Sequence, residues 1–498
     1  MSEPLILALD QGTTSTRAIL FTAQGRALAE AGSPLEQHYP HDGWVEHDAD
    51  EIFAEAVKAL RAAVDKAGRS LSDVAAIGVT NQRETIVLWD RATGKPVHKA
   101  IVWQDRRTEP ACAALRKRGL EGRVTQITGL LLDPYFSGTK LAWLLDHVAG
   151  ARAAAARGDL LAGTIDTWVI WKLTGGKVHA TDATNASRTL LYDIREHDWS
   201  AEMGEMLGVP LNILPEVRDC AGDYGETDAG VLGRAIPIRG VAGDQQAALM
   251  GQGCIRPGEM KATYGTGCFM LLNTGEAAPV SQARLLTTVA AQVAGRTTYA
   301  LEGAIFIAGA AIQWLGEGLG IEGGPKAAEA LAAKARDDLG VVVVPAFTGL
   351  GAPWWDANAR GGIFGLTRDA GLPEIARAAF DASALQTRDL IEAMRADAGQ
   401  AFKGDVEIRI DGGMARSAWF SQRLADLTGV GVCRATFEET TALGAALFAG
   451  LGSGVYASLE EAASARPTTE AYKPQMSAEP RERAYARWLD AVNRVRAG

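Results

Sequence analysis

A short polar segment near the N-terminus carries residue types that can bind an anion. In "LILALDQGTTSTRAILF", Asp10 precedes Gly12 and four consecutive hydroxyl residues, Thr13 to Thr16. Backbone N–H groups beside a glycine can cradle phosphate oxygens together with nearby hydroxyls, and a neighbouring carboxylate can hold a divalent cation. A plain turn needs only the glycine and one residue that hydrogen-bonds to its own backbone. The segment therefore predicts a nucleotide-phosphate site, with an ordinary polar hairpin as the alternative.

Two further glycine-rich turns follow later in the chain. They are "YGTGCF", Tyr264 to Phe269, and "DGGMARS", Asp411 to Ser417, and each comes after a β-prone run. The chain has no G-x-x-x-x-G-K-[ST] segment and no G-x-G-x-x-G after a strand, so a P-loop and a dinucleotide fingerprint are both excluded. A nucleotide site built from these turns requires another architecture.

A candidate catalytic carboxylate lies in "GVAGDQQAALMGQG". Asp244 follows an apolar strand, Arg239 to Ala242, and precedes a predicted helix. A carboxylate at the carboxyl end of a strand can face a cleft and accept a proton from a substrate hydroxyl. The alternative is a helix N-cap, because Asp is among the preferred N-cap residues.

Two polar clusters accompany this carboxylate, each directly after a strand. They are "TNQRET", residues 80–85, and "AIVWQDRR", residues 100–107. At a cleft, Arg83 and Glu84 would supply a donor and an acceptor for adjacent hydroxyls, whereas on the surface they would be a solvated charge pair of little energetic value. Trp103 is either a core indole or an apolar wall for a carbon skeleton.

The elements that must position these residues fall into two similar sets. The first set is three strands, 5–9, 16–21 and 26–30, followed by a helix over 50–66 whose start, Asp48 with Glu51, resembles a capping box. A second hairpin, 261–264 and 268–272, echoes the first. This repetition predicts an internal duplication with a ligand-binding cleft between the halves. The segment 481–498 has apolar residues at helical spacing and predicts a docking helix.

Composition narrows the class of protein. The chain has 498 residues, 47% hydrophobic and 22% charged, which predicts a globular protein of two or three domains. A net charge of −10 argues against a general nucleic-acid binder. No apolar run is long enough to span a bilayer and the N-terminus has no basic region, so we expect no membrane insertion and a cytoplasmic location. The five cysteines form no C-x-x-C pair, which predicts reduced thiols, and we interpret His38, His41 and His47 as ordinary surface histidines, not a metal site.

Taken together, these motifs resemble the glycerol kinases of the FGGY carbohydrate kinase family. The matching segments run through nearly the whole chain and include "LDQGTTSTR", "TNQRET", "DPYFSGTKLAWLLDH", "DATNASRTLL", "AGDQQAA", "TYGTGCFML" and "LEGAIFIAGAAIQWL". The resemblance implies an α/β fold of two duplicated actin-like (ribonuclease H-like) ATPase domains, residues 1–252 and 253–498, with an inter-domain catalytic cleft. It implies ATP-dependent phosphorylation of glycerol to sn-glycerol 3-phosphate, which feeds glycerol catabolism, with Mg²⁺ on the phosphates. We also expect a homo-oligomer, a dimer or a tetramer.

The resemblance also assigns residues to roles, position by position. Asp244 matches the general base, and Asp10 matches the carboxylate associated with Mg²⁺. The positions that match glycerol contacts, including two apolar walls, are Arg83, Glu84, Trp103, Tyr135, Asp244, Gln245 and Phe269. The positions that match ATP contacts are Thr13, Thr14, Ser15, Arg17, Thr266, Gly267, Gly309, Gln313, Gly413 and Ser417.

The sequence differs from the family pattern at two positions, and two other activities remain as alternatives. Ser417 stands where the family commonly has Asn near the adenine, and Arg234 lies one place earlier than the arginine of the loop that binds fructose 1,6-bisphosphate in inhibited bacterial members. The alternative activities are phosphorylation of another polyol or a pentulose by a kinase of the same family, and an actin-like or chaperone ATPase without a small acceptor.

Overall fold

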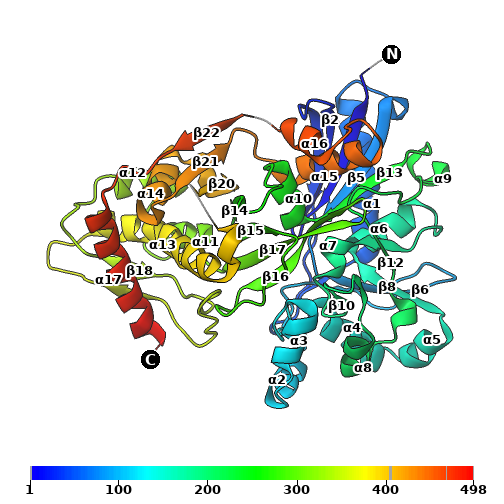
Figure 1. The fold of residues 1–498 in the computed structure, drawn as a ribbon, viewed down its shortest axis with the longest axis horizontal. Helices are drawn as coiled ribbons and strands as arrows, with labels where there is room; N and C mark the ends of the chain where they lie inside the picture. The colour runs from blue at the N-terminus through cyan, green and yellow to red at the C-terminus, as the bar shows by residue number, and fades with distance from the viewer. Residues whose placement is uncertain (1–2, 403–405, 467, 497–498) are drawn as a thin grey trace.

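A computed structural model describes residues 3–402, 406–466 and 468–496. Two large mixed sheets, each with its own helices, form the two ends of the elongated molecule seen in Figure 1. In the part of the chain that is described, no helix is long and apolar enough to cross a membrane. All five cysteines are buried and unpaired, as predicted for reduced thiols.

The first sheet has the strand order β13-β5-β1-β2-β3. Its strands are β1 (Leu5–Gln11), β2 (Ser15–Thr22), β3 (Ala27–Pro34), β5 (Val74–Asn81) and β13 (Ile238–Gly243). The first three strands are antiparallel, as predicted, while β5 lies parallel to β1 and β13 lies parallel to β5. Because carboxyl ends of parallel strands meet at one edge, the residues after β1, β5 and β13 come together there.

The second sheet repeats this plan. Its order is β16-β17-β15-β14-β20-β21-β22. Its strands are β14 (Met260–Tyr264), β15 (Cys268–Gly275), β16 (Leu286–Val293), β17 (Arg296–Ile305), β20 (Glu407–Asp411), β21 (Gly431–Ala435) and β22 (Thr469–Tyr472). Strands β14, β15 and β17 are antiparallel neighbours, and β20 and β21 continue parallel to β14. The shared hairpin-plus-parallel-strand pattern confirms the predicted duplication.

A smaller four-stranded sheet, β4-β7-β6-β8, extends the first half. Its strands are β4 (Glu46–His47), β6 (Ile86–Asp90), β7 (Ala100–Ile101) and β8 (Leu160–Thr164). The helices of this half include α1 (Ala49–Lys66), α2 (Glu109–Lys117), α3 (Glu121–Thr128), α4 (Ser137–His147), α5 (Ala151–Arg157), α6 (Ile165–Leu173), α7 (Ala183–Ala186), α8 (Ala201–Leu207) and α9 (Ala229–Leu232). Three short strand pairs lie outside the large sheets. They are β9 (Ala180–Asp182) with β12 (Glu216–Arg218), β10 (Tyr192–Asp193) with β11 (Asp198–Trp199), and β18 (Val342–Val344) with β19 (Gly362–Phe364).

Helix α1 begins one residue earlier than predicted and its cap is simpler. Asp48 accepts hydrogen bonds from the backbone N–H groups of Asp50 and Glu51, so it is the N-cap. The Glu51 carboxylate does not complete a capping box, because it accepts from the N–H of Glu36 at 3.3 Å instead.

Helix α15 (Thr440–Gly452) joins the two halves. In the chain it lies between β21 and β22 of the second sheet, but it packs on β13, β5 and β1 of the first sheet and on α10 (Asp244–Gly251). Glycine makes this contact close, because a Cβ at Gly78 would lie 2.2 Å from the Ala445 carbonyl oxygen. The orange helices α15 and α16 (Leu459–Ser464) accordingly lie beside the blue strands in Figure 1. The domain boundary at residues 252 and 253 stays a prediction.

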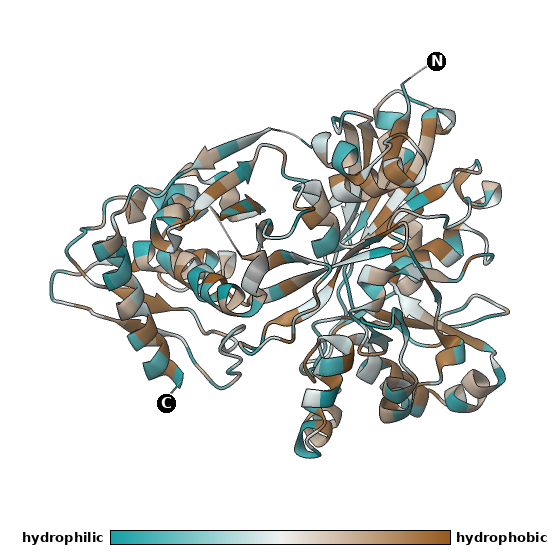
Figure 2. Cartoon of the chain, viewed as in Figure 1, coloured by the Kyte–Doolittle hydropathy of each residue, from teal (hydrophilic) through white to brown (hydrophobic). Residues whose placement is uncertain are grey.

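The second half is covered by α11 (Gly309–Glu317), α12 (Gly324–Ala332), α13 (Leu372–Ala398), α14 (Ala418–Thr428) and α17 (Ala478–Arg496). Teal and brown residues alternate along α13 and α17 in Figure 2, as expected of helices with one buried face. Trp488 and Val492 of α17 are fully buried in the core of this half, which supports the predicted docking helix over its described residues.

Candidate active site

Asp244 lies at the edge where the parallel strands of the first sheet end. It is the first residue of α10, and its carboxylate faces Arg83 Nε at 3.1 Å. The N-cap of α10 is Gly243 and no side chain caps this helix, so the N-cap interpretation of Asp244 is wrong. Burial raises the pKa of Asp244 above its usual range, against the lowering effect of Arg83 and Lys261. A carboxylate of raised pKa at a cleft is suited to accept a proton.

Arg83 is buried and ion-paired. Its guanidinium contacts the carboxylate of Glu302 at 2.5 Å and the Tyr135 hydroxyl at 3.3 Å, in addition to Asp244. Only 2% of the Arg83 side chain is exposed, so the alternative of a solvated surface pair with Glu84 is wrong.

Glu84 is held in an unusual backbone conformation. Its φ is +64°, in the left-handed region that few residues other than glycine adopt. Its carboxylate accepts from Arg188 Nε at 2.7 Å, and its carbonyl oxygen accepts from Ser137 Oγ at 2.8 Å. These partners hold the strained residue in place at the strand end.

Three aromatic rings from both halves lie together, and one of them, Tyr135, contacts Arg83. Trp103 lies edge-on to Tyr135 at 5.5 Å and to Phe269 at 6.4 Å between ring centroids. Its indole N–H donates to Thr13 Oγ1 at 2.8 Å, so the ring lies between the charged residues and the first hairpin. Trp103 is half-buried rather than a core residue, which is compatible with an apolar wall for a ligand.

The first glycine-rich turn connects β1 to β2. The Gly12 N–H donates to the Ser15 carbonyl at 2.9 Å, and the Gln82 amide donates to the Gly12 carbonyl at 3.1 Å. Thr14 is exposed at its tip, with Thr13 and Ser15 half-buried on either side. These contacts fix the turn against the end of β5.

Asp10 and Arg17 flank this turn. Burial raises the pKa of Asp10 to about 7, with further increases from the negative charges of Asp244 and Glu439. Arg17 forms an ion pair with Glu439, which immediately precedes α15. A carboxylate whose ionisation is opposed by two other negative charges is suited to bind a divalent cation, because the cation would offset that repulsion.

The second turn and the start of α11 form one unit. Thr266 carries the carbonyl that accepts from the N–H groups of Ala308 and Ala310, and the Gly309 N–H donates to the Gly265 carbonyl. A Cβ at Gly267 would lie 2.4 Å from the Ile305 carbonyl oxygen, so only glycine fits there.

The predicted nucleotide residues of the second half lie on different elements. Gln313 is exposed on α11, and Gly413 is exposed after β20 with open space where a Cβ would be. Ser417 is the N-cap of α14, because its Oγ accepts from the Phe420 N–H at 2.8 Å. Gln245, predicted to contact glycerol, accepts through Oε1 from the buried Lys261 ammonium.

Four charged residues of the site were missing from the sequence prediction: Arg188, Lys261, Glu302 and Glu439. Arg188 and Glu302 lie within the quoted segments "DATNASRTLL" and "LEGAIFIAGAAIQWL", Lys261 is the first residue of the predicted strand 261–264, and Glu439 lies outside the predicted elements. A buried charge inside an apolar strand is the signal that marks Glu302 and Lys261, because such groups need partners.

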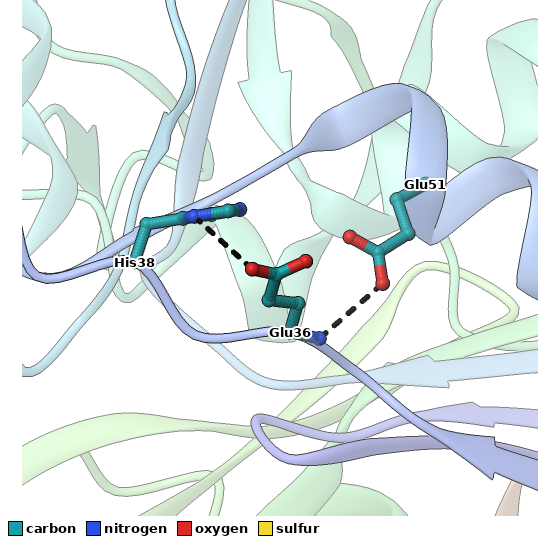
Figure 3. A group of neighbouring side chains, drawn as sticks. All are labelled: Glu36, His38 and Glu51. Atoms are coloured by element: carbon teal, nitrogen blue, oxygen red, sulfur yellow. Dashed lines mark hydrogen bonds and ion pairs between the residues drawn. The ribbon is translucent and has the colours of Figure 1, made fainter.

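The histidine cluster divides in the structure. His41 is exposed, as predicted, but His47 is fully buried and burial lowers its pKa to about 4, so the surface interpretation is wrong for His47. Figure 3 shows His38 next to Glu36, whose backbone N–H donates to Glu51. Within the described residues these are the one group of three or more His, Cys, Asp or Glu side chains whose ligand atoms lie within 4.8 Å of one another, and Glu36 is exposed to solvent.

Comparison with known proteins agrees with this arrangement. Models of the N-terminal and C-terminal domains of the FGGY family of carbohydrate kinases match residues 5–251 and 260–453. The chain is 54% identical over 490 residues to a protein named glycerol kinase from Chelativorans sp., covering 98% of each chain, and 56% identical over 494 residues to one from Cereibacter sphaeroides, covering 99% of each. The structure of Plasmodium falciparum glycerol kinase with ADP is similar, with a TM-score of 0.93 and 33% identity over 99% of this chain and 98% of that one. The xylulose kinase of Rhodospirillum rubrum shares the fold, with a TM-score of 0.86 and 24% identity over 99% of each chain. This chain belongs to the FGGY family of carbohydrate kinases.

Proposed function

We propose that this protein phosphorylates glycerol with ATP to give sn-glycerol 3-phosphate. The observation that carries the proposal is the buried pair of Arg83 and Glu84 at a strand end. Arg83 contacts Asp244 and Tyr135, and the ring of Trp103 lies next to those of Tyr135 and Phe269. A guanidinium donor and a carboxylate acceptor suit the adjacent hydroxyls of a small polyol, and the rings suit its carbon backbone. Relatives named glycerol kinase, more than half identical over 98–99% of this chain, support this substrate.

In the proposed reaction Asp244 is the general base. It takes the proton from the attacking hydroxyl while Arg83 and Glu84 hold the neighbouring hydroxyls, so that the nucleophile meets the γ-phosphorus in line. The hydroxyls and N–H groups of Thr13, Thr14 and Ser15 would bind phosphate oxygens from one side.

The opposing hairpin and the nucleotide contacts complete the proposal. Thr266 and Gly267 would bind phosphate oxygens from the other half, and Arg17 would bind once released from Glu439. Gly309, Gln313, Gly413 and Ser417 would contact the nucleoside, and Gln245 would contact glycerol.

Asp10 is the residue proposed to hold Mg²⁺. Burial and the negative charges of Asp244 and Glu439 raise the pKa of Asp10, and a bound cation would offset that repulsion. Bound there, Mg²⁺ would neutralise charge on the phosphates. The division of the chain at residue 252, a dimer or tetramer, and a cytoplasmic location remain parts of the proposal.

A coupled assay of ADP release tests the proposal. We expect the highest kcat/KM with glycerol among glycerol, dihydroxyacetone, erythritol and xylulose, and oxidation of the product by an sn-glycerol-3-phosphate dehydrogenase. A higher kcat/KM with xylulose or erythritol would favour the other polyol or pentulose kinases. ATP hydrolysis that none of the four compounds accelerates would favour an actin-like ATPase.

A further inference from the structure

Glu302 connects the two halves at the proposed glycerol site. It lies on β17 of the second sheet and is fully buried. Its carboxylate accepts from Arg83 Nη1 at 2.5 Å and Nη2 at 3.2 Å, and from Arg188 Nη2 at 2.8 Å. Both arginines belong to the first half, so one carboxylate of the second half binds two cations of the first.

The two bonds to Arg83 fix the plane of its guanidinium. A planar group held at both terminal nitrogens cannot rotate about its long axis. In this orientation Nε faces the Asp244 carboxylate at 3.1 Å and Nη2 lies 3.3 Å from the Tyr135 hydroxyl. Glu302 therefore sets which edge of Arg83 is turned toward the general base.

Arg188 extends the same control to Glu84. Its Nε donates to Glu84 Oε1 at 2.7 Å while its Nη2 donates to Glu302. Its guanidinium also lies over the rings of Tyr135 and Phe136, at 5.6 and 5.3 Å from their centroids. Arg188 thus bridges the strained Glu84 and Glu302 of the other half, so Glu302 helps to hold Glu84 in place through Arg188.

The charge of Glu302 persists at neutral pH. Burial raises the pKa of Glu302, but the ion pairs with Arg188 and Arg83 outweigh burial and bring the pKa to about 2. Without this carboxylate, two buried guanidinium groups would face each other without their shared counter-ion, which is costly in a low-dielectric site.

We propose that Glu302 is a positioning residue for glycerol, because it holds Arg83 directly and Glu84 through Arg188 in their binding orientation. The inference rests on the proposed function. Since Glu302 is on the second half, the glycerol site is complete only when the two halves are together. Glu302 has no part in holding the nucleotide in this proposal, so its effect should be selective for glycerol.

The test compares Glu302→Gln with wild type in steady-state kinetics with glycerol and ATP varied separately. Glutamine keeps the size but presents an amide N–H₂ to one guanidinium, so the glycerol KM should rise about 10- to 100-fold, while the ATP KM stays within about twofold. Asp389→Asn is the matched control. It removes another buried carboxylate, one that binds Trp354, Trp488 and Tyr485 in the core of the second half, and should leave both KM values unchanged.

Several outcomes decide the question. A glycerol KM within about threefold of wild type in folded Glu302→Gln would overturn the proposal, as would equal changes in both KM values, which indicate a general structural role. If Glu302→Gln does not fold, Glu302→Asp takes its place, because Asp keeps the negative charge on a side chain that is one methylene shorter. The glycerol KM should again rise while the ATP KM stays unchanged. Wild-type protein that does not phosphorylate glycerol would refute the proposed function instead, so the two failures are distinguishable.

Discussion

Replacing Asp244 by Asn tests the chemistry of the site most directly. The substitution is nearly isosteric and removes the group that accepts the proton. The Oδ1 that accepts from the Gln245 N–H at 2.7 Å can be kept by the amide oxygen, so α10 should begin at the same residue. Arg83 loses its 3.1 Å ion pair with Asp244 but keeps Glu302 and the Tyr135 hydroxyl, so its guanidinium should stay in place.

The expected loss is concentrated in kcat. General-base catalysis contributes about 10² to 10⁴ in rate, equivalent to about 3 to 5 kcal/mol of activation free energy. The glycerol KM should change by less than about fivefold, because Arg83 and Glu84 remain paired and a neutral amide can still hydrogen-bond to a hydroxyl. Asp48→Asn is the matched control. It changes a true N-cap at α1, and Asn caps a helix about as well as Asp, so its kcat should equal that of wild type.

Initial rates at saturating ATP, with thermal unfolding to confirm that the variant is folded, decide the matter. If folded Asp244→Asn retains kcat within a few-fold of wild type, Asp244 is not the base. A large increase in glycerol KM at unchanged kcat would mean that Asp244 only binds the substrate.

Three other perturbations give separate tests. Ser417→Asn should keep the N-cap of α14 and lower the ATP KM without changing the glycerol KM, since Asn adds two donors; an unchanged ATP KM would remove Ser417 from the nucleotide site. Burial and the charge of Asp182 raise the pKa of Asp166 to about 7, so the folded state binds a proton between about pH 4 and 7 that the unfolded chain has lost, and stability falls as pH rises through this range. The melting temperature of Asp166→Asn minus that of wild type should thus be more positive at pH 8 than at pH 5, and an equal difference at both would contradict the argument. Sub-millimolar fructose 1,6-bisphosphate should not inhibit the enzyme, because the exposed Arg234 lies one residue earlier than the arginine of the inhibited members and its guanidinium is therefore displaced from the effector phosphate; strong inhibition would show another effector site.

The hairpins and the strand ends were predictable from sequence because they depend on local patterns. The apolar runs of β1, β2, β14 and β15 were placed within three residues of their observed bounds, since alternating apolar segments beside glycine turns have few other solutions. Asp244 was recognised from its place after a strand. Its alternative as an N-cap is wrong because Gly243, one residue earlier, is the N-cap and Asp244 is the first helical residue.

The residues that sequence missed depend on contacts between distant segments. Arg83 and Glu302 are separated by 219 positions in the chain, and Arg188 and Glu302 by 114. No local periodicity encodes such a pairing. The prediction for His47 is wrong for a related reason, because the two-residue strand β4 in which it is buried is too short to produce an alternating pattern.

The charged network around Arg83 is better explained by function than by stability. Moving two guanidinium groups and two carboxylates out of water costs several kcal/mol per ion, and well-packed apolar residues of the same volume are often as stable or more stable. The four side chains here are at most 2% exposed: Arg83, Arg188, Glu84 and Glu302. The desolvation free energy therefore already opposes folding before any ligand binds. In exchange, the site holds fixed donors and acceptors. Because they are already oriented when a polyol enters, they need no reorganisation during phosphoryl transfer. The site therefore combines expensive, rigid charges for the acceptor with hydroxyl-rich turns for the phosphates, and the carboxylate that completes the rigid part comes from the opposite half of the molecule.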